Sequence, residues 1–252
     1  MTHLSLFSGI GGLDLAAEWA GFETVGQCEF ADYPTKVLEK HWPDVPRWRD
    51  IRTLTKESFY ERTGLRTVDV ISGGFPCQPF SVAGKQKGKG DDRYLWPEML
   101  RVIRELRPHC VVGENVSGLI RIALAEIISE LQNIGYEARA YSSAAWDVGG
   151  LHKGERIFIV AETDNRSAAV WGNVQFSPDG SIKRCGDHNG RRAEAPDLWE
   201  RWKIEPRPYG VANGIPNRVD RLKCLGNAVV PQQAYPIFRA LREELMRMEE
   251  TT

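Results

Sequence analysis

The chain has 252 residues, a formal net charge of -1, 42% hydrophobic residues and 27% charged residues. These values suit a globular protein with one large domain and a small appendage, and they exclude a uniformly basic nucleic-acid binder. Its five cysteines include no CxxC spacing, so we expect a reduced protein without a disulfide framework or a metal site. Neither a signal peptide nor a membrane span is evident, and we expect a cytoplasmic protein without a membrane partner.

Short apolar runs alternate with helix-like stretches through the first part of the chain. This alternation predicts a parallel sheet with helices on both faces, which is an α/β fold. The predicted strands are residues 4–7, 22–28, 68–72, 109–112, 136–141 and 157–161, and the predicted helices are residues 13–20, 33–41, 95–106 and 120–131.

The periodic pattern breaks between residues 162 and 212, which are rich in Gly, Pro, Trp, Asn and charge. Trp171, Trp199 and Trp202 in this segment favour a folded unit over a disordered insert. One more helix is predicted at residues 232–248. We therefore divide the chain into a main domain at 1–161, a small irregular domain at 162–212 and a final segment at 213–252.

A glycine-rich turn follows the first predicted strand and opens the first predicted helix. It contains Phe7, Gly9, Gly11 and Gly12. Glycines allow the backbone to approach a ligand closely, and this turn is where nucleotide-like cofactors bind in open α/β sheets. Many tight turns are glycine-rich for steric reasons alone, so the turn needs support from other residues.

Two acidic residues give that support, because Glu29 follows the second predicted strand and Asp50 stands at the next plausible strand end. Glu29 can accept hydrogen bonds from both hydroxyls of a ribose. Asp50 can accept from an adenine amino group while Ile51 packs on the ring. Taken alone, Glu29 reads as a surface residue and Asp50 as a turn residue; together with the glycine turn they predict a nucleoside-containing cofactor.

The most specific feature is residues 73–81, Gly-Gly-Phe-Pro-Cys-Gln-Pro-Phe-Ser, directly after a predicted buried strand. Pro76 and Pro79 make the loop rigid and place Cys77 at the carboxyl edge of the sheet. Such a position favours a reactive thiolate, although a lone cysteine is more often a buried structural residue. The prolines and the glycine pair favour the reactive interpretation.

Residues 7–12, 73–81, 114–116 and 221–231 together resemble the ordered motifs of cytosine carbon-5 DNA methyltransferases of the compact prophage or restriction-modification type. The resemblance implies a Rossmann-like methyltransferase fold that uses S-adenosylmethionine. It makes residues 1–161 the catalytic and cofactor-binding domain and residues 162–212 a small target recognition domain. Residues 213–252 become the late motif and a C-terminal helix that returns to the catalytic domain.

The resemblance implies three catalytic residues. Cys77 would attack carbon 6 of the cytosine, Glu114 would hold or donate a proton at ring nitrogen 3, and Arg156 would contact the carbonyl oxygen. The family usually shows Gln-x-Arg-x-Arg around the last position, whereas this chain has His152 and Gly154 in place of the Gln and the first Arg. This departure either weakens activity or marks a subfamily with a compensating arginine elsewhere.

The expected cofactor contacts extend beyond the glycine turn and its acids. They are Phe7, Gly9, Gly11, Gly12, Glu29, Phe30, Asp50, Ile51, Pro76, Leu95, Asn227, Ala228 and Val229. Cys224 stands where the family motif usually has Gln, and we interpret it as a packing residue.

The expected substrate is double-stranded DNA, and its target base must leave the stack to react. Residues 82–93 form a Gly/Lys loop suited to closing over the flipped base, although the same composition is typical of a solvated surface loop. The expected DNA contacts in and beside this loop are Gln78, Ser81, Lys85, Lys87, Lys89 and Arg93. We expect a monomer, and a cognate restriction endonuclease is a candidate partner.

Three alternatives remain open. An RNA cytosine methyltransferase can share the same fold and nucleophile motif. A catalytically silent DNA-binding regulatory protein would explain the altered arginine motif, but it would not explain why both Cys77 and Glu114 are present. An NAD-dependent Rossmann enzyme would explain the glycine turn and nothing about residues 73–81.

Overall fold

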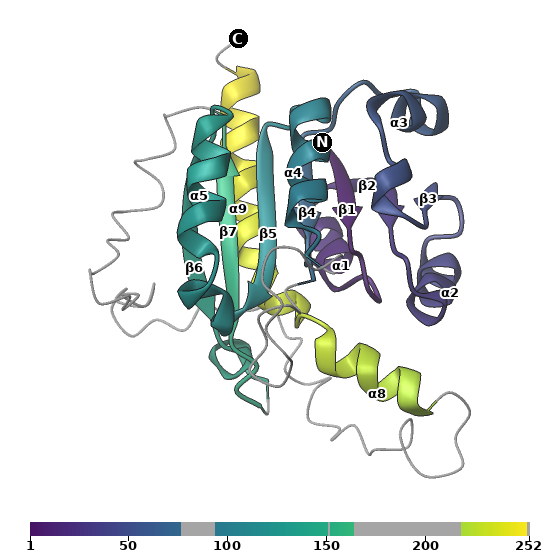
Figure 1. The fold of residues 1–252 in the computed structure, drawn as a ribbon, viewed down its shortest axis with the longest axis vertical. Helices are drawn as coiled ribbons and strands as arrows, with labels where there is room; N and C mark the ends of the chain where they lie inside the picture. The colour runs from purple at the N-terminus through teal and green to yellow at the C-terminus, as the bar shows by residue number, and fades with distance from the viewer. Residues whose placement is uncertain (77–93, 151, 164–217, 251–252) are drawn as a thin grey trace.

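A seven-stranded sheet forms the centre of the protein (Figure 1). The computed structural model describes residues 1–76, 94–150, 152–163 and 218–250. The strand order is β3-β2-β1-β4-β5-β7-β6, and every neighbouring pair is parallel except the two that involve β7. The strands are β1 (Thr2–Leu6), β2 (Glu23–Cys28), β3 (Arg47–Trp48), β4 (Val70–Gly73), β5 (Cys110–Val116), β6 (Glu137–Ser143) and β7 (Arg156–Glu162). The predicted mostly parallel α/β fold is therefore confirmed.

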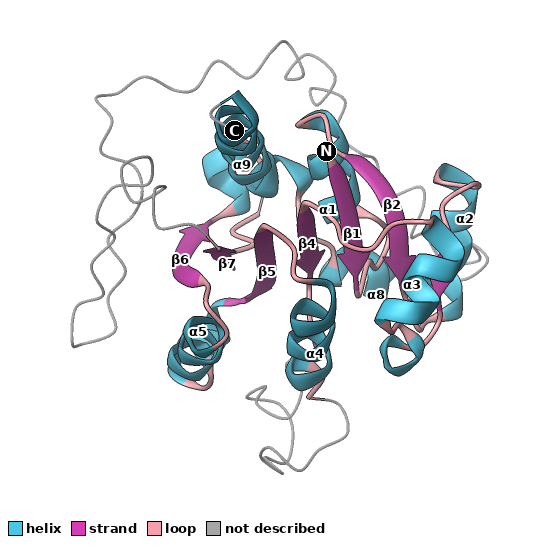
Figure 2. Cartoon of the chain, turned by 90° about the horizontal axis from the view of Figure 1, so that it is seen from above, coloured by secondary structure: helices cyan, strands magenta, loops and turns pink. Residues whose placement is uncertain are grey.

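Helices cover both faces of the sheet. Figure 2 shows α3, α4 and α5 on one face and α1 and α9 on the other. The helices are α1 (Gly12–Trp19), α2 (Asp32–His41), α3 (Lys56–Thr63), α4 (Trp96–Leu106), α5 (Leu124–Asn133), α8 (Arg218–Asn227) and α9 (Pro231–Glu250), with short 3-10 segments η1 (Ile51–Thr53), η4 (Ser117–Arg121) and η5 (Ala145–Val148). No helix in the described ranges is both long enough and apolar enough to cross a lipid bilayer.

Two hydrophobic cores hold these layers together, one on each face of the sheet. Met99, Ile103 and Leu106 of α4 bury one stripe of that helix against the first face. Phe238 and Leu241 of α9 do the same on the second face, where α9 also packs on α1. The apolar spacing of α4 and α9 is thus explained by burial against the sheet.

Several elements differ from the sequence-based prediction. The two-residue strand β3 is too short to give a period, so only a strand end at Asp50 was expected there. The helix α3 buries only Phe59 and was not predicted. The helix α8 was also not predicted. The strand β5 runs to Val116, so Glu114 lies within the strand and not after it.

The reversal of β7 also departs from a simple parallel sheet. Residues 144–155 connect β6 to β7, and the part of this connection that the structure describes contains η5 and no helix that crosses the sheet. Without such a crossover, two neighbouring strands must run antiparallel. As a result the first residue of β7, Arg156, lies beside Val116 at the carboxyl end of β5.

Candidate active site

The carboxyl ends of the parallel strands form the edge at which a ligand is expected. In open α/β sheets, ligands bind where the strand order reverses. Here the order reverses between β1 and β4, and a cavity of about 950 Å³ opens at this edge. This volume lies at the upper end of the range for small-molecule sites, about 300–1,000 Å³.

The cavity wall brings together residues from far apart in the chain. They follow β1, β2, β3 and β4, lie near the end of β5, or come from α8 and the residues directly after it. Among them are Phe7, Gly9, Gly12, Glu29, Phe30, Asp50, Ile51, Pro76, Leu95, Glu114, Cys224, Asn227, Ala228 and Val229. All the expected cofactor residues except Gly11 thus lie on the wall, as does Cys224, which the sequence presented as a packing residue.

The glycine turn needs its glycines for close packing. A Cβ on Gly11 would lie 2.5 Å from the ring of Trp42, and Gly11 has a φ of +88°. A Cβ on Gly12 would lie 2.8 Å from the carbonyl oxygen of Val229. Gly11 therefore lets the turn pack on α2 behind the wall, and Gly12 lets α1 begin directly against the late segment that forms the opposite side.

Glu29 is oriented by backbone amides. The N–H of Gly9 donates to one carboxylate oxygen at 2.8 Å, and the N–H of Ala31 donates to the other at 2.8 Å. No other donor among the described residues is seen at these oxygens, and a carboxylate oxygen can accept two hydrogen bonds, so each has a second lone pair to offer. The carboxylate is thus fixed in place and can still accept from a ligand in the cavity.

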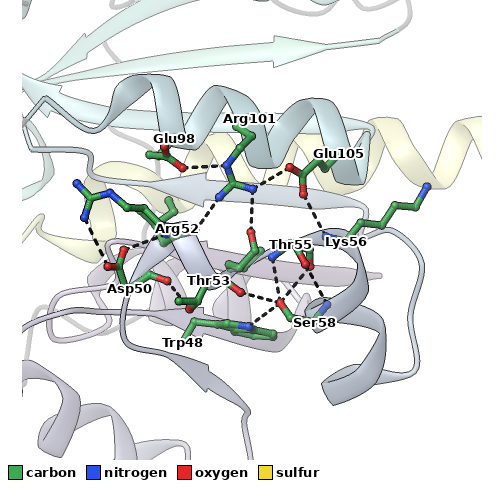
Figure 3. A network of polar contacts seen from close by, with 12 residues as sticks. Trp48, Asp50, Arg52, Thr53, Thr55, Lys56, Ser58, Glu98, Arg101 and Glu105 are labelled. Carbon is green, nitrogen blue, oxygen red and sulfur yellow. Dashed lines mark hydrogen bonds and ion pairs between the residues drawn. The ribbon is translucent and has the colours of Figure 1, made fainter.

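The turn that contains Asp50 and Ile51 is held by an arginine, Arg101, whose role the sequence did not indicate (Figure 3). Arg101 on α4 donates to the carbonyls of Ile51, at 2.8 Å, and Leu54, at 3.1 Å. On its own helix it also pairs with Glu98 and Glu105, each at 2.8 Å. This single guanidinium fixes the turn after β3 to the helix that begins at the cavity.

The spacing of Glu98, Arg101 and Glu105 is typical of ion pairs on a helix surface. Nothing in that spacing indicates the two carbonyl contacts, which depend on how α4 packs against η1. The sequence therefore contained no signal for this role of Arg101.

Glu114 and Arg156 form a largely buried ion pair. Their side chains are 11% and 14% exposed, and Nε of Arg156 lies 2.9 Å from Oε1 of Glu114. Burial raises the pKa of Glu114 to about 7, and the guanidinium of Arg156 opposes that rise. Glu114 can therefore carry a proton near neutral pH, which suits a general acid or base.

The end of β4 makes room for this carboxylate and anchors the loop that follows. A Cβ on Gly74 would lie 2.8 Å from Oε2 of Glu114. The side-chain amide of Asn115 donates to the carbonyl of Phe75 at 2.9 Å, and the Phe75 ring packs on Trp96. Asn115, whose role was not predicted, thus fixes the chain two residues before Cys77. Cys77, Gln78, Ser81, Lys85, Lys87, Lys89 and Arg93 lie outside the described residues.

His152 and Gly154, the two residues that depart from the arginine motif, lie against each other. Gly154 has a φ of +42°, and a Cβ there would lie 2.7 Å from Nε2 of His152. The imidazole of His152 therefore occupies the space that a side chain at position 154 would enter. The N–H of Ala145 donates to the carbonyl of Lys153 at 2.8 Å and closes the loop around this pair.

Comparison with known proteins identifies the family. Residues 1–184 match the family model of C-5 cytosine-specific DNA methylases. The chain belongs to this family. Among known methylases, it is 39% identical over 173 residues to the Type II methyltransferase M.AquIA of Picosynechococcus sp., with 62% of this chain and 70% of that protein covered. It is 37% identical over 164 residues to the Type II methyltransferase M.NgoFVII of Neisseria gonorrhoeae, with 62% and 42% covered.

Solved structures of methyltransferases share the fold. A protein from E. coli described as a prophage-encoded DNA modification methyltransferase superposes with a TM-score of 0.57 at 26% identity. That match covers 68% of this chain and 50% of the E. coli chain. The present chain thus spans about half the length of this structural relative and less than half of the gonococcal one.

Proposed function

We propose that this chain transfers a methyl group from S-adenosylmethionine to carbon 5 of a cytosine in double-stranded DNA, with Cys77 as the nucleophile. The observation that carries the proposal is the composition of one cavity. Its wall joins the glycine turn and Glu29 to Glu114, which is paired with Arg156. Family membership supports the same reaction.

The residues of the cavity fit the proposed cofactor. Glu29 would accept from the ribose hydroxyls, and Asp50 from the adenine amino group. Ile51 and Phe30 would pack on the adenine ring, and Asn227, Ala228 and Val229 would close the far side. When bound, the cofactor supplies an electrophilic methyl group attached to a positively charged sulfur.

The chain's own residues would make carbon 5 of cytosine reactive. Attack by the Cys77 thiolate on carbon 6 forms a carbon–sulfur bond and pushes an electron pair toward carbon 5 and ring nitrogen 3. Glu114 would hold a proton at nitrogen 3, and Arg156 would stabilise charge at the carbonyl oxygen. Carbon 5 then takes the methyl group, loses its proton, and the thiolate leaves as the double bond re-forms.

The remaining parts of the proposal concern the DNA and its context. The target base would be flipped out of the duplex, with residues 82–93 closing over it and residues 162–212 reading the sequence. We propose a cytoplasmic monomer. A cognate restriction endonuclease is the partner suggested by relatives that are named Type II methyltransferases.

A duplex with 5-fluorocytosine at the target position tests the reaction. Fluorine replaces the hydrogen that must leave carbon 5, so the reaction should stop as a denaturation-resistant adduct between protein and DNA when the cofactor is present. Because the target sequence is unknown, bisulfite sequencing of host DNA after expression comes first and identifies it.

The control for the adduct is Cys77→Ser, which should abolish it while binding S-adenosylhomocysteine like the wild type, because a hydroxyl is far less ionised than a thiol. A serine variant that forms the adduct as fast as the wild type would show that Cys77 is not the nucleophile. A structured RNA tested in parallel distinguishes an RNA cytosine methyltransferase from a DNA methyltransferase. A wild type that modifies neither nucleic acid would favour a silent binder.

A further inference from the structure

A buried glutamine of the C-terminal helix lies between the two sides of the cavity. Gln233, in the first turn of α9, is 3% exposed. Its Nε2 donates to the carbonyl of Ser143 at 2.7 Å and to the carbonyl of Gly154 at 3.0 Å. Its Oε1 accepts from the N–H of Val230 at 3.3 Å. Both donor hydrogens and the acceptor of this side chain are therefore used.

The two carbonyls lie at the ends of one loop. Ser143 is the last residue of β6, and Gly154 lies two residues before Arg156. The strands pair Ser143 with Arg156, so Gln233 closes the loop at the point where β7 begins. This first residue of β7 is Arg156, and its backbone position decides where its guanidinium meets Glu114.

The acceptor of Gln233 contacts the residue that follows the late part of the cavity wall. Val230 follows directly on the wall residues Asn227, Ala228 and Val229. Val229 in turn lies against Gly12 of the glycine turn. One side chain thus holds the late wall of the cavity with its oxygen and the start of the catalytic strand with its nitrogen.

We propose that Gln233 is a positioning residue for methyl transfer, which fixes the start of β7, and with it Arg156, relative to the wall formed by residues 227–229. This inference rests on the proposed function. It assigns separate tasks to the two ends of one amide: the nitrogen sets the catalytic ion pair, and the oxygen sets the cofactor wall.

Two substitutions separate these tasks. Gln233→Glu keeps an oxygen for the Val230 N–H but loses both donors, so single-turnover methyl transfer should slow about tenfold, because small errors in position are costly in rate. Its affinity for S-adenosylhomocysteine should stay within about twofold of the wild type. Gln233→Leu loses the oxygen as well, so it should slow transfer similarly and also weaken cofactor binding about threefold to tenfold.

The matched control is Gln232→Leu, at the neighbouring position of the same helix. The buried Oε1 of Gln232 accepts no hydrogen bond from the described residues. This variant should methylate DNA and bind S-adenosylhomocysteine like the wild type. All rates are measured with saturating DNA and cofactor, well below the lowest melting temperature of the set.

Hydrogen exchange gives a readout that does not depend on activity. The amides of Ala145 and Gly150 close the loop by donating to the carbonyls of Lys153 and Ala145. They should exchange at least about tenfold faster in both Gln233 variants than in Gln232→Leu, because local opening follows the loss of tertiary contacts.

Wild-type transfer rates in both Gln233 variants would overturn the inference. So would a failure of both to fold when Gln232→Leu folds, because that result assigns Gln233 to overall stability. The proposed function fails in a different way: the wild type and Gln232→Leu would then both lack transfer and adduct formation, whatever the exchange data show.

Discussion

Two sides of the cavity are held by different kinds of contact: the proposed cofactor side, with the glycine turn and Glu29, and the proposed catalytic side, with Glu114 and its partner Arg156. On the cofactor side, the turn after β1 meets Glu29 through a hydrogen bond between residues 20 positions apart. Beneath it, the buried Asp14 accepts from Ser5 at 2.8 Å and from Gln27 at 2.7 Å. These contacts join β1, α1 and β2, which follow one another in the chain.

On the catalytic side, every important contact joins distant segments. Glu114 and Arg156 meet because β7 inserts antiparallel beside β5. Gln233 reaches a carbonyl 90 positions away. The glycine turn and Glu29 should therefore depend little on distant parts of the chain, whereas the geometry of Glu114 and Arg156 depends on the whole fold. Four predictions test this difference, from the largest expected effect to the smallest.

Glu114→Gln should have the largest effect. An amide of the same size fills the space beside Gly74 but cannot transfer a proton to ring nitrogen 3. Methyl transfer should fall about 10²-fold or more, as is usual for loss of a general acid or base. Calorimetry should find the affinity for S-adenosylhomocysteine within about twofold of the wild type. Glu155→Gln, at a partly exposed neighbour of Arg156, is the control; an equal loss in both variants would contradict the assignment.

Glu29→Ala should act on the opposite side. It removes a carboxylate held by two backbone amides, so we expect S-adenosylhomocysteine to bind about tenfold to a hundredfold more weakly. Methyl transfer at saturating cofactor should change little. Calorimetry and single-turnover rates measure the two effects, with Glu23→Ala, at the exposed start of β2, the strand that Glu29 follows, as the control. If transfer at saturation fell as far as binding, the two sides of the cavity would not be separable.

The pH dependence of the methyl-transfer rate should reveal the ion pair between Glu114 and Arg156. Glu114 has a pKa of about 7. Below that pH it carries the proton needed at nitrogen 3; above it, the protonated fraction and the rate should fall about tenfold per pH unit. Among the described residues, Arg156 supplies the charge that lowers this pKa, while Gly74 and Pro76 on the facing strand end carry none. Arg156→Gln should therefore move the falling limb of the rate profile to higher pH. A limb that stays in place would exclude Glu114 as the group that titrates.

Arg101→Met should have the smallest effect. It frees the carbonyls of Ile51 and Leu54, so the turn that carries Asp50 should loosen and S-adenosylhomocysteine should bind about threefold to tenfold more weakly. Arg101→Lys should fall between this variant and the wild type, because lysine can reach only some of these partners. Arg104→Met, on the exposed side of the same helix, should bind normally. If both Arg101→Met and Arg104→Met lost the same affinity, the loss of one positive charge would explain the effect, and the carbonyl contacts would not.

The sequence predicted those parts of the site that depend on local order. The glycine turn, Glu29 and Asp50 each follow a strand, and the carboxyl ends of parallel strands meet at one edge of a sheet. Once the alternation of strands and helices was recognised, it was possible to expect that these residues share a wall. The left-handed backbone at Gly11, with a φ of +88°, likewise follows from sterics that act within a few residues, whereas the need for glycine at position 12 comes from the distant Val229.

Only the tertiary structure decided the rest. No period or motif spacing indicates that β7 runs antiparallel and brings Arg156 to Glu114, or that Arg101 and Gln233 use backbone carbonyls far away in the chain. The sequence also contained no sign that the His152 ring fills the space beside Gly154, since it showed only that an arginine of the usual motif is missing. Such contacts arise from packing between distant elements, where a buried polar group must find its partner in whatever segment lies beside it.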